Sequence, residues 1–409
     1  MRAAVVGGGL AGLSAALELG DSGHEVTVYE ARPTLGGAVQ TLPRRDGDPE
    51  PPPDNGQHIA LGCFEAYLGF LERIGESGSL RREPLELPVL DERACRAVIR
   101  PSALALLRYR HLPLGDRMRI LRVLVHWSTN PGGGTFAEAL RRRGQSPLAI
   151  ERFWDVFIRP ALNLPAAEAD AAVGDFTVRT ALLSGKRASD LLLPARPLGE
   201  MHGEAAGRAL EAAGATVRTG TRIDDLGELE AGAVVVAVPP AESARLLGLP
   251  ESQLGYSPIV SVHLLFDRRL LHEPLAALLG SPAHWVFDRG RLTGHEPETG
   301  QYLTVVSSGA PELEALRGRE LVELISGALV ERLGSAEVLW SRVSREPEAT
   351  IAVGPGSEQF RPGPRTSRPN VTRAGAWTAT GWPPTMEGAV RSGIAAAQAL
   401  TSARHEVAA

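Results

Sequence analysis

Asp54 and His58 lie four residues apart in the segment PDNGQHIALGC, which covers residues 53–63. A carboxylate near an imidazole could bind a metal ion, move a proton, or serve only to shape a turn. A metal site needs three or four ligands, and the nearby Cys63 and Glu65 show no recognisable ligand spacing, so we expect none here. Asp-Asn-Gly tolerates left-handed backbone, which favours a structural turn capped by Asp54. The catalytic and the structural interpretations both stay open at this point.

The first thirty residues predict the scaffold that must position such a pair. Residues 3–30, AAVVGGGLAGLSAALELGDSGHEVTVYE, have the pattern of a buried strand, a glycine turn, a helix of small residues and a second strand. Gly7 permits the tight turn, Gly9 lets the backbone approach a pyrophosphate, and Gly12 lets the helix pack closely. The helix N-terminus would offer free N–H groups to the anion. We therefore predict a dinucleotide-binding βαβ unit.

Glu30 ends the second strand, eighteen residues after Gly12. A carboxylate there can accept hydrogen bonds from the ribose of an adenosine, and it would repel a 2′-phosphate, so NADP is disfavoured. The chain continues as EARPTLGGAVQT over residues 30–41, with the pair Gly36-Gly37. Far downstream, residues 374–400 read AGAWTATGWPPTMEGAVRSGIAAAQAL.

These two segments resemble the GG motif and the C-terminal flavin motif of the FAD-dependent amine oxidase and carotenoid desaturase superfamily. The resemblance implies that the dinucleotide is FAD, that a loop in the second segment meets the flavin, and that a helix N-terminus there points at the pyrimidine edge of the flavin. It also implies that a strand near residue 223 contacts the adenine through its backbone. The cofactor-binding residues that it implies are Gly7, Gly9, Leu10, Ala11, Gly12, Glu30, Ala31, Gly36, Gly37, Ile223, Gly375, Trp382, Thr385 and Met386.

The order of the segments predicts an α/β fold with a discontinuous Rossmann-like FAD-binding domain and a mixed substrate domain of sheet plus helices. We expect residues 1–75, 196–250 and 370–405 in the first domain, and residues 76–195 and 251–369 in the second. The stretch 76–195 has a mostly helical pattern, with a cap at Ser146 and Pro147 in the first turn, whereas strands dominate from about 255 to 350. Loops rich in proline and glycine at 43–56 and 354–370 either face solvent or arch over a site.

The segment DNGQHIALGCFEAYLGFLERIG, together with RPALNLP, VVVAVPP and GWPPTMEGAVRSG, narrows the resemblance to the squalene-associated FAD-dependent enzymes, the hydroxysqualene dehydroxylases. The resemblance covers essentially the whole chain. It implies a C30 isoprenoid substrate, hydroxysqualene, which loses its hydroxyl group as water and gains hydride from reduced flavin to become squalene. An apolar, dry pocket would keep water from recapturing the allylic cation. The electron donor that reduces the flavin is not identified by the sequence.

In this superfamily the segment after the GG loop passes close to the flavin, which supports a catalytic interpretation of the opening pair. His58 would donate the proton to the departing hydroxyl or orient a water that does, and Asp54 would orient His58. A purely structural turn remains the alternative.

Two positions depart from the superfamily pattern, and both would touch the cofactor. Related proteins have an Arg after the GG pair and an Asp after the glycine of the C-terminal motif, where this chain has Ala38 and Ala376. Either FAD binds weakly or other residues compensate. Three other functions therefore stay open: a carotenoid-type desaturase, an amine oxidase-like flavoenzyme, and a non-catalytic isoprenoid-binding partner protein.

The amino-acid composition excludes several other classes of protein. With 43 basic and 48 acidic residues, the net charge of -5 offers no surplus for a nucleic-acid backbone. The two cysteines, Cys63 and Cys95, suggest neither a disulfide nor a zinc framework. No apolar run reaches about 18 residues, and no signal-peptide pattern follows Met1, so we expect a cytoplasmic protein.

The segment PLGDRMRILRVLVHW, residues 113–127, predicts an amphipathic helix. Leu114, Met118, Leu121 and Val125 share one face, and Arg119, Arg122 and His126 share another. The simpler interpretation is a surface helix that packs its apolar face inward. The alternative is a peripheral membrane helix resting on anionic lipid at the inner face of the membrane.

Overall fold

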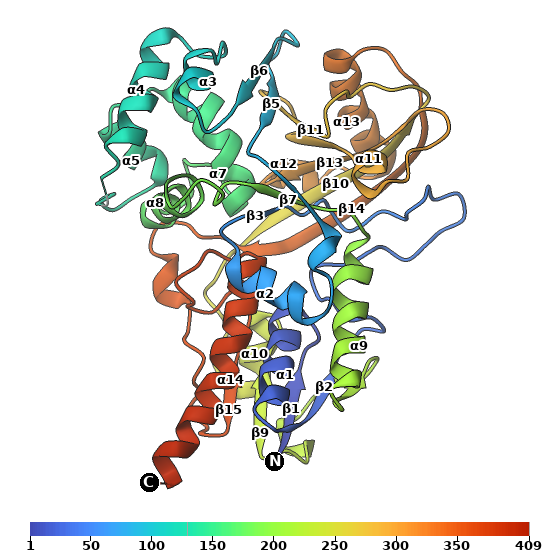
Figure 1. Ribbon diagram of the computed structural model, residues 1–409, viewed down its shortest axis with the longest axis vertical. Coiled ribbons are helices and arrows are strands. Elements are labelled where there is room, and N and C mark those ends of the chain that lie inside the picture. The colour runs from blue at the N-terminus through green and yellow to red at the C-terminus, as the bar shows by residue number, and fades with distance from the viewer. Residues whose placement is uncertain (129, 409) are drawn as a thin grey trace.

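The computed structural model describes residues 1–128 and 130–408, with side chains up to residue 401. The molecule is elongated. Figure 1 shows a parallel sheet with both chain ends at one end of the long axis, and a larger sheet with most of the short helices at the other.

The parallel sheet has five strands drawn from three separate stretches of the chain. Their order is β15 (Val371–Arg373), β9 (Ala233–Val236), β1 (Arg2–Val6), β2 (Glu25–Tyr29) and β8 (Thr216–Arg218). The predicted strand, helix and second strand of the βαβ unit are confirmed, with α1 (Leu10–Asp21) between β1 and β2. The sheet is therefore complete only when residues near both ends of the chain come together.

Alternate residues of β1 face opposite layers, as the two-residue period of a strand requires. Ala3 and Val5 pack under α1, α9 (Ala205–Ala212) and α14 (Met386–Ala408). Ala4 and Val6 belong to a second cluster, which includes side chains of α10 (Pro240–Leu247). Both faces are thus covered, which explains why β1 after Arg2 is an uninterrupted run of small apolar residues.

The larger sheet has seven strands, all antiparallel to their neighbours except for the pair β11 and β5. Its order is β14 (Val338–Ile351), β10 (Tyr256–Phe266), β13 (Gln301–Ser308), β12 (Trp285–Asp288), β11 (Leu275–Leu278), β5 (Leu87–Leu90) and β6 (Arg96–Ile99). One face packs on α13 (Gly318–Leu333) through Leu321, Ile325 and Leu329. The other contributes Trp285 and Phe287 to a core shared with helices from residues 103–178.

A small antiparallel sheet of β3 (Ala60–Leu61), β7 (Leu191–Pro194) and β4 (Leu80–Glu83) lies between the two large ones in Figure 1. The other α-helices are α2 (Glu65–Arg73), α3 (Ala103–Leu107), α4 (Leu114–Val125), α5 (Phe136–Arg142), α6 (Pro147–Ala149), α7 (Asp155–Leu162), α8 (Ala171–Val178), α11 (Arg289–Thr293) and α12 (Pro311–Glu314). Short segments of 3-10 or π-helix are η1 (Ser77–Ser79), η2 (Ile150–Trp154), η3 (Arg179–Leu183), η4 (Gly199–Glu204), η5 (Leu226–Glu228) and η6 (Ser357–Phe360).

The predicted cap at Ser146 is confirmed, because its hydroxyl accepts a hydrogen bond from the N–H of Ala149 at the start of α6. The mostly helical pattern of 76–195 missed four short strands, β4 to β7, whose pairing partners lie partly outside that stretch. Our division into two domains remains a prediction. Within the described residues, no helix combines the length and the apolar character needed to cross a bilayer.

The helix at 113–127 is confirmed as α4, but the simpler interpretation, in which Leu114, Met118 and Val125 pack inward, is wrong; the membrane alternative stays a prediction. Leu114, Met118 and Val125 are 62%, 51% and 66% exposed, whereas Ile120 and Val123 are buried. The error arose because both sides of this helix carry apolar residues, so the sequence period alone does not say which side packs on the core.

Candidate cofactor-binding and catalytic site

The glycine turn between β1 and α1 has the geometry that a close phosphate approach requires. Gly7 has a φ of +109°, and a Cβ added there would lie 2.3 Å from the carbonyl oxygen of Ala237. A Cβ on Gly12 would lie 1.9 Å from the carbonyl oxygen of Gly7. A Cβ on Gly9 would meet only the Cα of Gly37, at 3.6 Å. The backbone of Gly9, the residue that precedes Leu10 and Ala11 in α1, is therefore open to a ligand.

The GG pair lies directly against this turn. Gly36 donates its N–H to the carbonyl of Gly8 at 2.8 Å, and Gly37 has a φ of +62°. A Cβ on Gly37 would come within 2.7 Å of the Cα of Gly9. The two glycine motifs, separated by a helix and a strand in the sequence, thus form one continuous backbone surface.

Glu30 stands at the edge of this surface. Its carboxylate accepts hydrogen bonds from the N–H groups of Gly8 at 2.6 Å and Arg32 at 2.8 Å, with Ala31 between them in the chain. The carbonyl of Glu30 accepts from Thr221, which brings the chain before Ile223 beside it. Contrary to our expectation, Ile223 is not in a strand, because β8 ends at Arg218; its side chain is buried against the parallel sheet.

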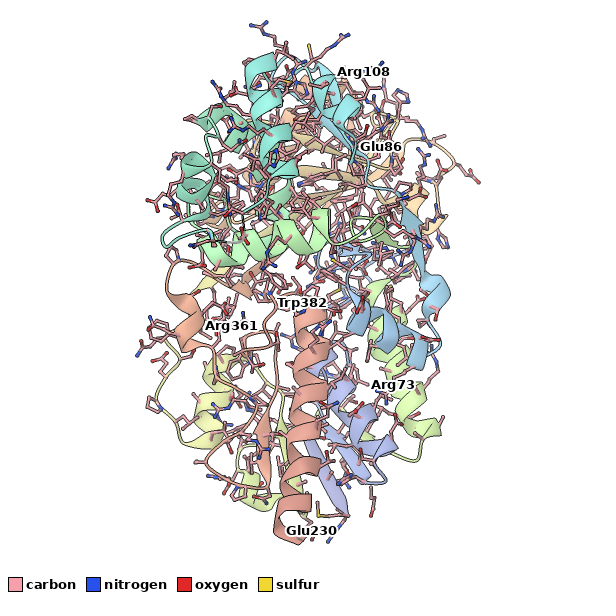
Figure 2. The ribbon with its side chains drawn as sticks, turned by 60° about the vertical axis from the view of Figure 1, so that its left-hand side comes forward. Arg73, Glu86, Arg108, Glu230, Arg361 and Trp382 are labelled. Atoms are coloured by element: carbon pink, nitrogen blue, oxygen red, sulfur yellow. The ribbon has the colours of Figure 1, made fainter. Side chains whose placement is uncertain are left out.

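The C-terminal motif approaches from another direction. Gly375 has a φ of +150° and donates its N–H to Ser392 Oγ at 2.8 Å. Trp382 packs edge-on against Phe64 and Phe176, with the guanidinium of Arg391 4.9 Å from its ring centre. Figure 2 shows Trp382 near the middle of the molecule, at the upper end of α14.

Helix α14 begins at Met386, and the hydroxyl of Thr385 accepts from the N–H of Gly388 at 3.3 Å. Glu387 is fully buried and joins two helices. Its carboxylate accepts from the N–H groups of Ala66 and Tyr67, in the first turn of α2, and from Arg391. The expected helix in this segment is confirmed, and α2 fixes the position of its first turn.

Arginines elsewhere in the chain reach the two positions where the motifs depart from the superfamily. Arg32 donates to the carbonyl of Gly37 at 3.3 Å, so its guanidinium lies beside the GG pair. Arg361, whose side chain is buried, donates to the carbonyls of Ala376 at 3.0 Å and Thr378 at 2.7 Å. Neither contact involves Ala38 or the side chain of Ala376, but each places a positive charge near the altered position (Figure 2 for Arg361).

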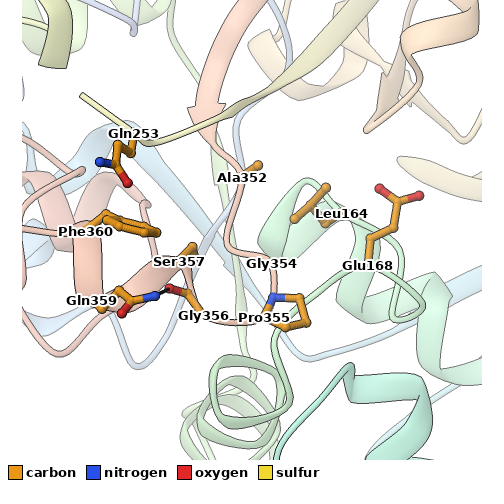
Figure 3. A pocket seen from close by; sticks show the side chains of 10 residues that line it. All are labelled: Leu164, Glu168, Gln253, Ala352, Gly354, Pro355, Gly356, Ser357, Gln359 and Phe360. Atoms are coloured by element: carbon orange, nitrogen blue, oxygen red, sulfur yellow. Dashed lines mark hydrogen bonds between the residues drawn. The ribbon is translucent and has the colours of Figure 1, made fainter. Parts of the chain in front are cut away.

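The loop at 354–370 that supplies Arg361 also lines a cavity of about 320 Å³ (Figure 3). Glu168, Gln253 and Gln359 contribute polar groups to its lining. A second cavity, of about 240 Å³, is lined mainly by apolar side chains, among them Leu106, Leu124 and Phe153. Of the two, the second has the chemistry that an isoprenoid chain requires.

The carboxylate of Asp54 connects three other segments of the chain through hydrogen bonds. One carboxylate oxygen accepts from Thr41 Oγ1 at 2.7 Å and from the N–H of Leu198 at 3.0 Å, and the other accepts from Arg289 at 2.7 Å. No described hydrogen bond joins Asp54 to His58. No direct contact therefore supports the proposed role of Asp54 in orienting His58. Several hydrogen bonds support its predicted role in shaping the turn.

His58 lies in a different environment. Its Nδ1 is buried and has no hydrogen-bond partner among the described residues. Burial lowers its pKa below 6.5, although the charge of Asp54 opposes that shift. The lowered pKa favours the neutral imidazole, whose Nδ1 can hydrogen-bond a ligand as donor or acceptor, depending on the tautomer.

A second buried histidine lies near His58. His202 in η4 pairs with the hydroxyl of Tyr67 through Nε2 at 2.7 Å and with the carbonyl of Leu198 through Nδ1 at 2.8 Å. Burial, with a smaller contribution from nearby His58, lowers the pKa of His202 to about 4. This pair of histidines was not anticipated from the sequence, where 144 residues separate them.

The loop at 43–56 is anchored to α11 and β14 by two buried arginines. Arg289 in α11 donates to Asp54 and to the carbonyl of Pro52, and Arg342 in β14 donates to Asp48 at 2.5 Å and to the carbonyl of Pro43. Residues 43–47 are exposed, so this part of the loop faces solvent, whereas residues 53–56 are buried. No local signal in the sequence identifies either arginine as a partner of the loop.

The residues present fit FAD. Where the two glycine motifs meet, the backbone is bare and Gly9 is open, as a pyrophosphate requires. Two buried polar atoms on the flanking segments, Gln40 Nε2 and His58 Nδ1, lack partners among the described residues. The described part of the chain contains no group of three or more His, Cys, Asp and Glu arranged to hold a metal ion.

Comparisons with known proteins agree with this assignment. A family model described as an NAD(P)-binding Rossmann-like domain matches residues 5–71, and one described as a flavin containing amine oxidoreductase matches residues 199–401. A hydroxysqualene dehydroxylase of Sinorhizobium fredii is 30% identical over 97% of this chain and 98% of its own length. A probable zeta-carotene desaturase of Synechococcus elongatus is 27% identical over 99% of both chains.

Among solved structures, cyclohexylamine oxidase of Brevibacterium oxydans superimposes with a TM-score of 0.73 at 16% identity, over 100% of this chain and 99% of the other. This likeness shows the fold alone: a Rossmann-like domain combined with a mixed sheet.

Proposed function

The chain belongs to the hydroxysqualene dehydroxylase family and is an FAD-dependent oxidoreductase, and from that premise we propose that it converts hydroxysqualene to squalene. Similarity along the whole length to a protein of that name is the observation that carries the proposal. The reaction would form squalene for squalene or hopanoid biosynthesis.

In the proposed reaction a C–O bond breaks and a C–H bond forms. One proton joins the departing hydroxyl to give water, and one hydride joins the allylic carbon, so the substrate gains two electrons. Bound FAD, when reduced, supplies the hydride. A two-electron donor outside this chain must then reduce the flavin again.

The residues of the chain must hold the cofactor, place the alcohol beside it and control one proton. We assign cofactor binding to the residues predicted above, from Gly7, Gly9 and Gly12 to Thr385 and Met386. Glu30 remains our candidate for the ribose.

We assign to His58 the control of the proton that joins the departing hydroxyl. The donor form is the protonated imidazolium, because a neutral imidazole cannot give up its N–H as an acid. Burial lowers the pKa of His58 and so disfavours this form, whereas the neutral ring can orient a water that supplies the proton. Buried Nδ1 without a partner supports this assignment, as does the position of residues 54–58 beside the GG loop, where Asn55 donates to the carbonyl of Ala38 at 2.9 Å. We assign Asp54 to holding the loop, with only an electrostatic influence on His58.

The decisive experiment mixes reduced, FAD-loaded protein with hydroxysqualene under anaerobic conditions. We expect squalene to appear while the absorbance of oxidised flavin returns with equal stoichiometry. In D2O, where the exchangeable hydrogen on N5 of reduced flavin is deuterium, the product should carry one deuterium on carbon. Squalene without that label would contradict hydride delivery from the flavin.

The runner-up function is a desaturase acting on a similar C30 chain, which the likeness to a carotene desaturase favours. It is tested with the oxidised protein. The proposed direction is wrong if dehydrosqualene reduces the flavin of the oxidised protein and hydroxysqualene fails to reoxidise the flavin of the reduced protein. An amine that reduces the flavin would instead favour the amine oxidase alternative.

A further inference from the structure

Helix α4 presents an apolar stripe to solvent. Leu114, Met118 and Val125 recur at helical spacing on one face, with half-buried Leu121 between them. Among the described residues, twelve large apolar side chains are exposed, and five of these belong to α3, α4 and η3. These five, Leu104, Leu114, Met118, Val125 and Leu183, thus gather on a small part of the surface, whereas isolated exposed apolar residues would need no explanation.

The charge around this stripe is strongly positive. Residues 100–126 contain six arginines and a single acid, Asp116, in a chain whose net charge is -5. Asp116 is buried and already paired with Arg119. Arg108, Arg110 and Arg122 are exposed, and none of them forms an ion pair with a residue that the structure describes. Their charge is therefore available to an external anion.

The stripe and the arginines share one surface. Arg122 follows Met118 by four residues and precedes Val125 by three, so it lies at the edge of the apolar stripe, although we expected it on the other face. Arg108 lies at the extreme end of the molecule opposite Glu230, as Figure 2 shows. Figure 1 places α3 and α4 at the end remote from the parallel sheet and from both termini. We call this region the α4 surface: Leu104, Leu114, Met118, Val125 and Leu183, with Arg108, Arg110 and Arg122.

The apolar cavity of about 240 Å³ opens at the α4 surface. Its lining includes Val125 and Leu183, which are exposed, together with Leu106, Leu124 and Phe153, which lie deeper. An apolar molecule could pass from the surface into this cavity without crossing charged groups, because the only ionisable side chains in the lining are Arg100 and Tyr109. Arg100 is exposed and paired with Glu86 at the rim.

We propose that the α4 surface docks on an anionic lipid bilayer, with α4 lying in the headgroup region and the cavity behind it facing the acyl chains. Apolar side chains beside unpaired arginines complement a membrane of negative charge, where each arginine and each buried methylene contributes. The further role of the cavity, receiving the isoprenoid from the bilayer, rests on the proposed function. Docking itself does not, so the two proposals can fail separately.

The test is flotation of the FAD-loaded full-length protein with vesicles. We expect binding to vesicles of phosphatidylcholine with phosphatidylglycerol, at least tenfold weaker binding to phosphatidylcholine alone, and release when salt rises from roughly 0.05 M to 0.5 M. The triple change Arg108→Gln, Arg110→Gln and Arg122→Gln should lower partitioning at least tenfold. The double change Met118→Glu and Val125→Glu should do the same.

The matched control is Leu324→Glu with Leu339→Glu, since these exposed apolar residues lie on α13 and β14. It should leave vesicle binding unchanged. Docking is excluded if the parent protein stays with the unbound fraction, or if the control weakens binding as much as the α4 changes do. A parent dimer that Met118→Glu converts to a monomer would show that a second copy covers this surface instead. Should the glutamate double variant fail to fold, the arginine triple variant alone decides, because its three side chains are exposed.

Discussion

Arg289 and Asp54, 235 residues apart in the chain, form an ion pair at 2.7 Å in which each side chain is only 2% exposed. The pair ties α11, in the larger sheet's layer, to the loop that leads into His58. Because Asp54 also accepts from Thr41 and Leu198, its two oxygens fix three segments at once. The carboxylate therefore holds the site together whether or not it influences catalysis.

Removing either partner of this pair should destabilise the fold strongly. We expect Arg289→Ala to lower the free energy of unfolding by about 3 to 5 kcal/mol, because Asp54 would be left as a buried charge with fewer partners. The matched control is Arg319→Ala, whose exposed pair with Glu323 should contribute about 0.5 kcal/mol or less. Denaturant unfolding of both variants measures the difference, and equal losses would contradict a structural role for the buried pair.

His58→Ala should preserve FAD content and stability while lowering turnover about 10²-fold or more, the usual contribution of a general acid. His58→Gln, which keeps a donor of similar reach, should recover part of the rate. Gln57→Ala is the neighbouring control and should turn over like the parent. A His58→Ala protein that forms squalene at the parent rate would leave residues 53–63 as a turn without a catalytic function.

We expect protein purified without added cofactor to carry FAD below full occupancy, because Ala38 and Ala376 replace polar contacts. Arg32 should partly compensate at the GG pair, so Arg32→Ala should weaken FAD binding about tenfold, which corresponds to about 1.4 kcal/mol. Ala376→Asp should strengthen it. Titration of the apoprotein, followed by quenching of flavin fluorescence, measures both changes independently of turnover.

Gly9→Val is the complementary change at the same site. Because its side chain would fill the open space above the turn, it should abolish FAD binding. If the parent protein is fully occupied by FAD and keeps it through dialysis, Ala38 and Ala376 do not weaken FAD binding.

Stability should fall as the pH is lowered from about 6.5 toward 4. Burial lowers the pKa of His202 to about 4, of His263 to about 3 and of His284 to about 4. In the unfolded chain these histidines take up protons near pH 6.5, but in the folded chain they do not, so acid favours unfolding. Each contributes about 1.4 kcal/mol per pH unit within that window, and the full contribution is present above it.

His263→Gln should therefore reduce the slope of stability against pH by about 1.4 kcal/mol per unit between pH 6.5 and 4. Exposed His126 provides the control, and His126→Gln should leave the slope as in the parent. Unfolding by urea at several pH values gives both slopes. An unchanged slope in the His263 variant would indicate that this histidine is already protonated in the folded chain.

The part of the site that could be predicted depends on local motifs. Glycines that require a positive φ or a close backbone approach, such as Gly7 and Gly37, can be identified from the sequence because no other residue fits there. Thr385 at the start of α14 can be recognised in the sequence for a similar reason, since a threonine hydroxyl can cap the N-terminus of a helix. In each case the physical requirement falls on residues adjacent in sequence.

The unpredicted parts depend on contacts between remote segments. Arg289 resembles any other arginine in sequence, and only the assembled fold brings it to Asp54. His58 and His202 meet for the same reason. The inward-packing interpretation of α4 was wrong because Ile120 and Val123 compete with Met118 and Val125 for the core, and only the packing of neighbouring helices decides between them.

Helix α14 packs along α1, where Ser14 donates its hydroxyl to the carbonyl of Val390 and a Cβ on Gly393 would come within 2.1 Å of the carbonyl oxygen of Ala11. Helix α1 is therefore covered only after α14, far along the chain, has been made. A chain whose translation stops before residue 371 lacks β15 as well as α14, so it leaves an edge of the parallel sheet open and α1 uncovered. Uptake of FAD would then require that α14 had been made, and chains that stop earlier, with bare apolar surface, would be ready targets for quality-control proteases.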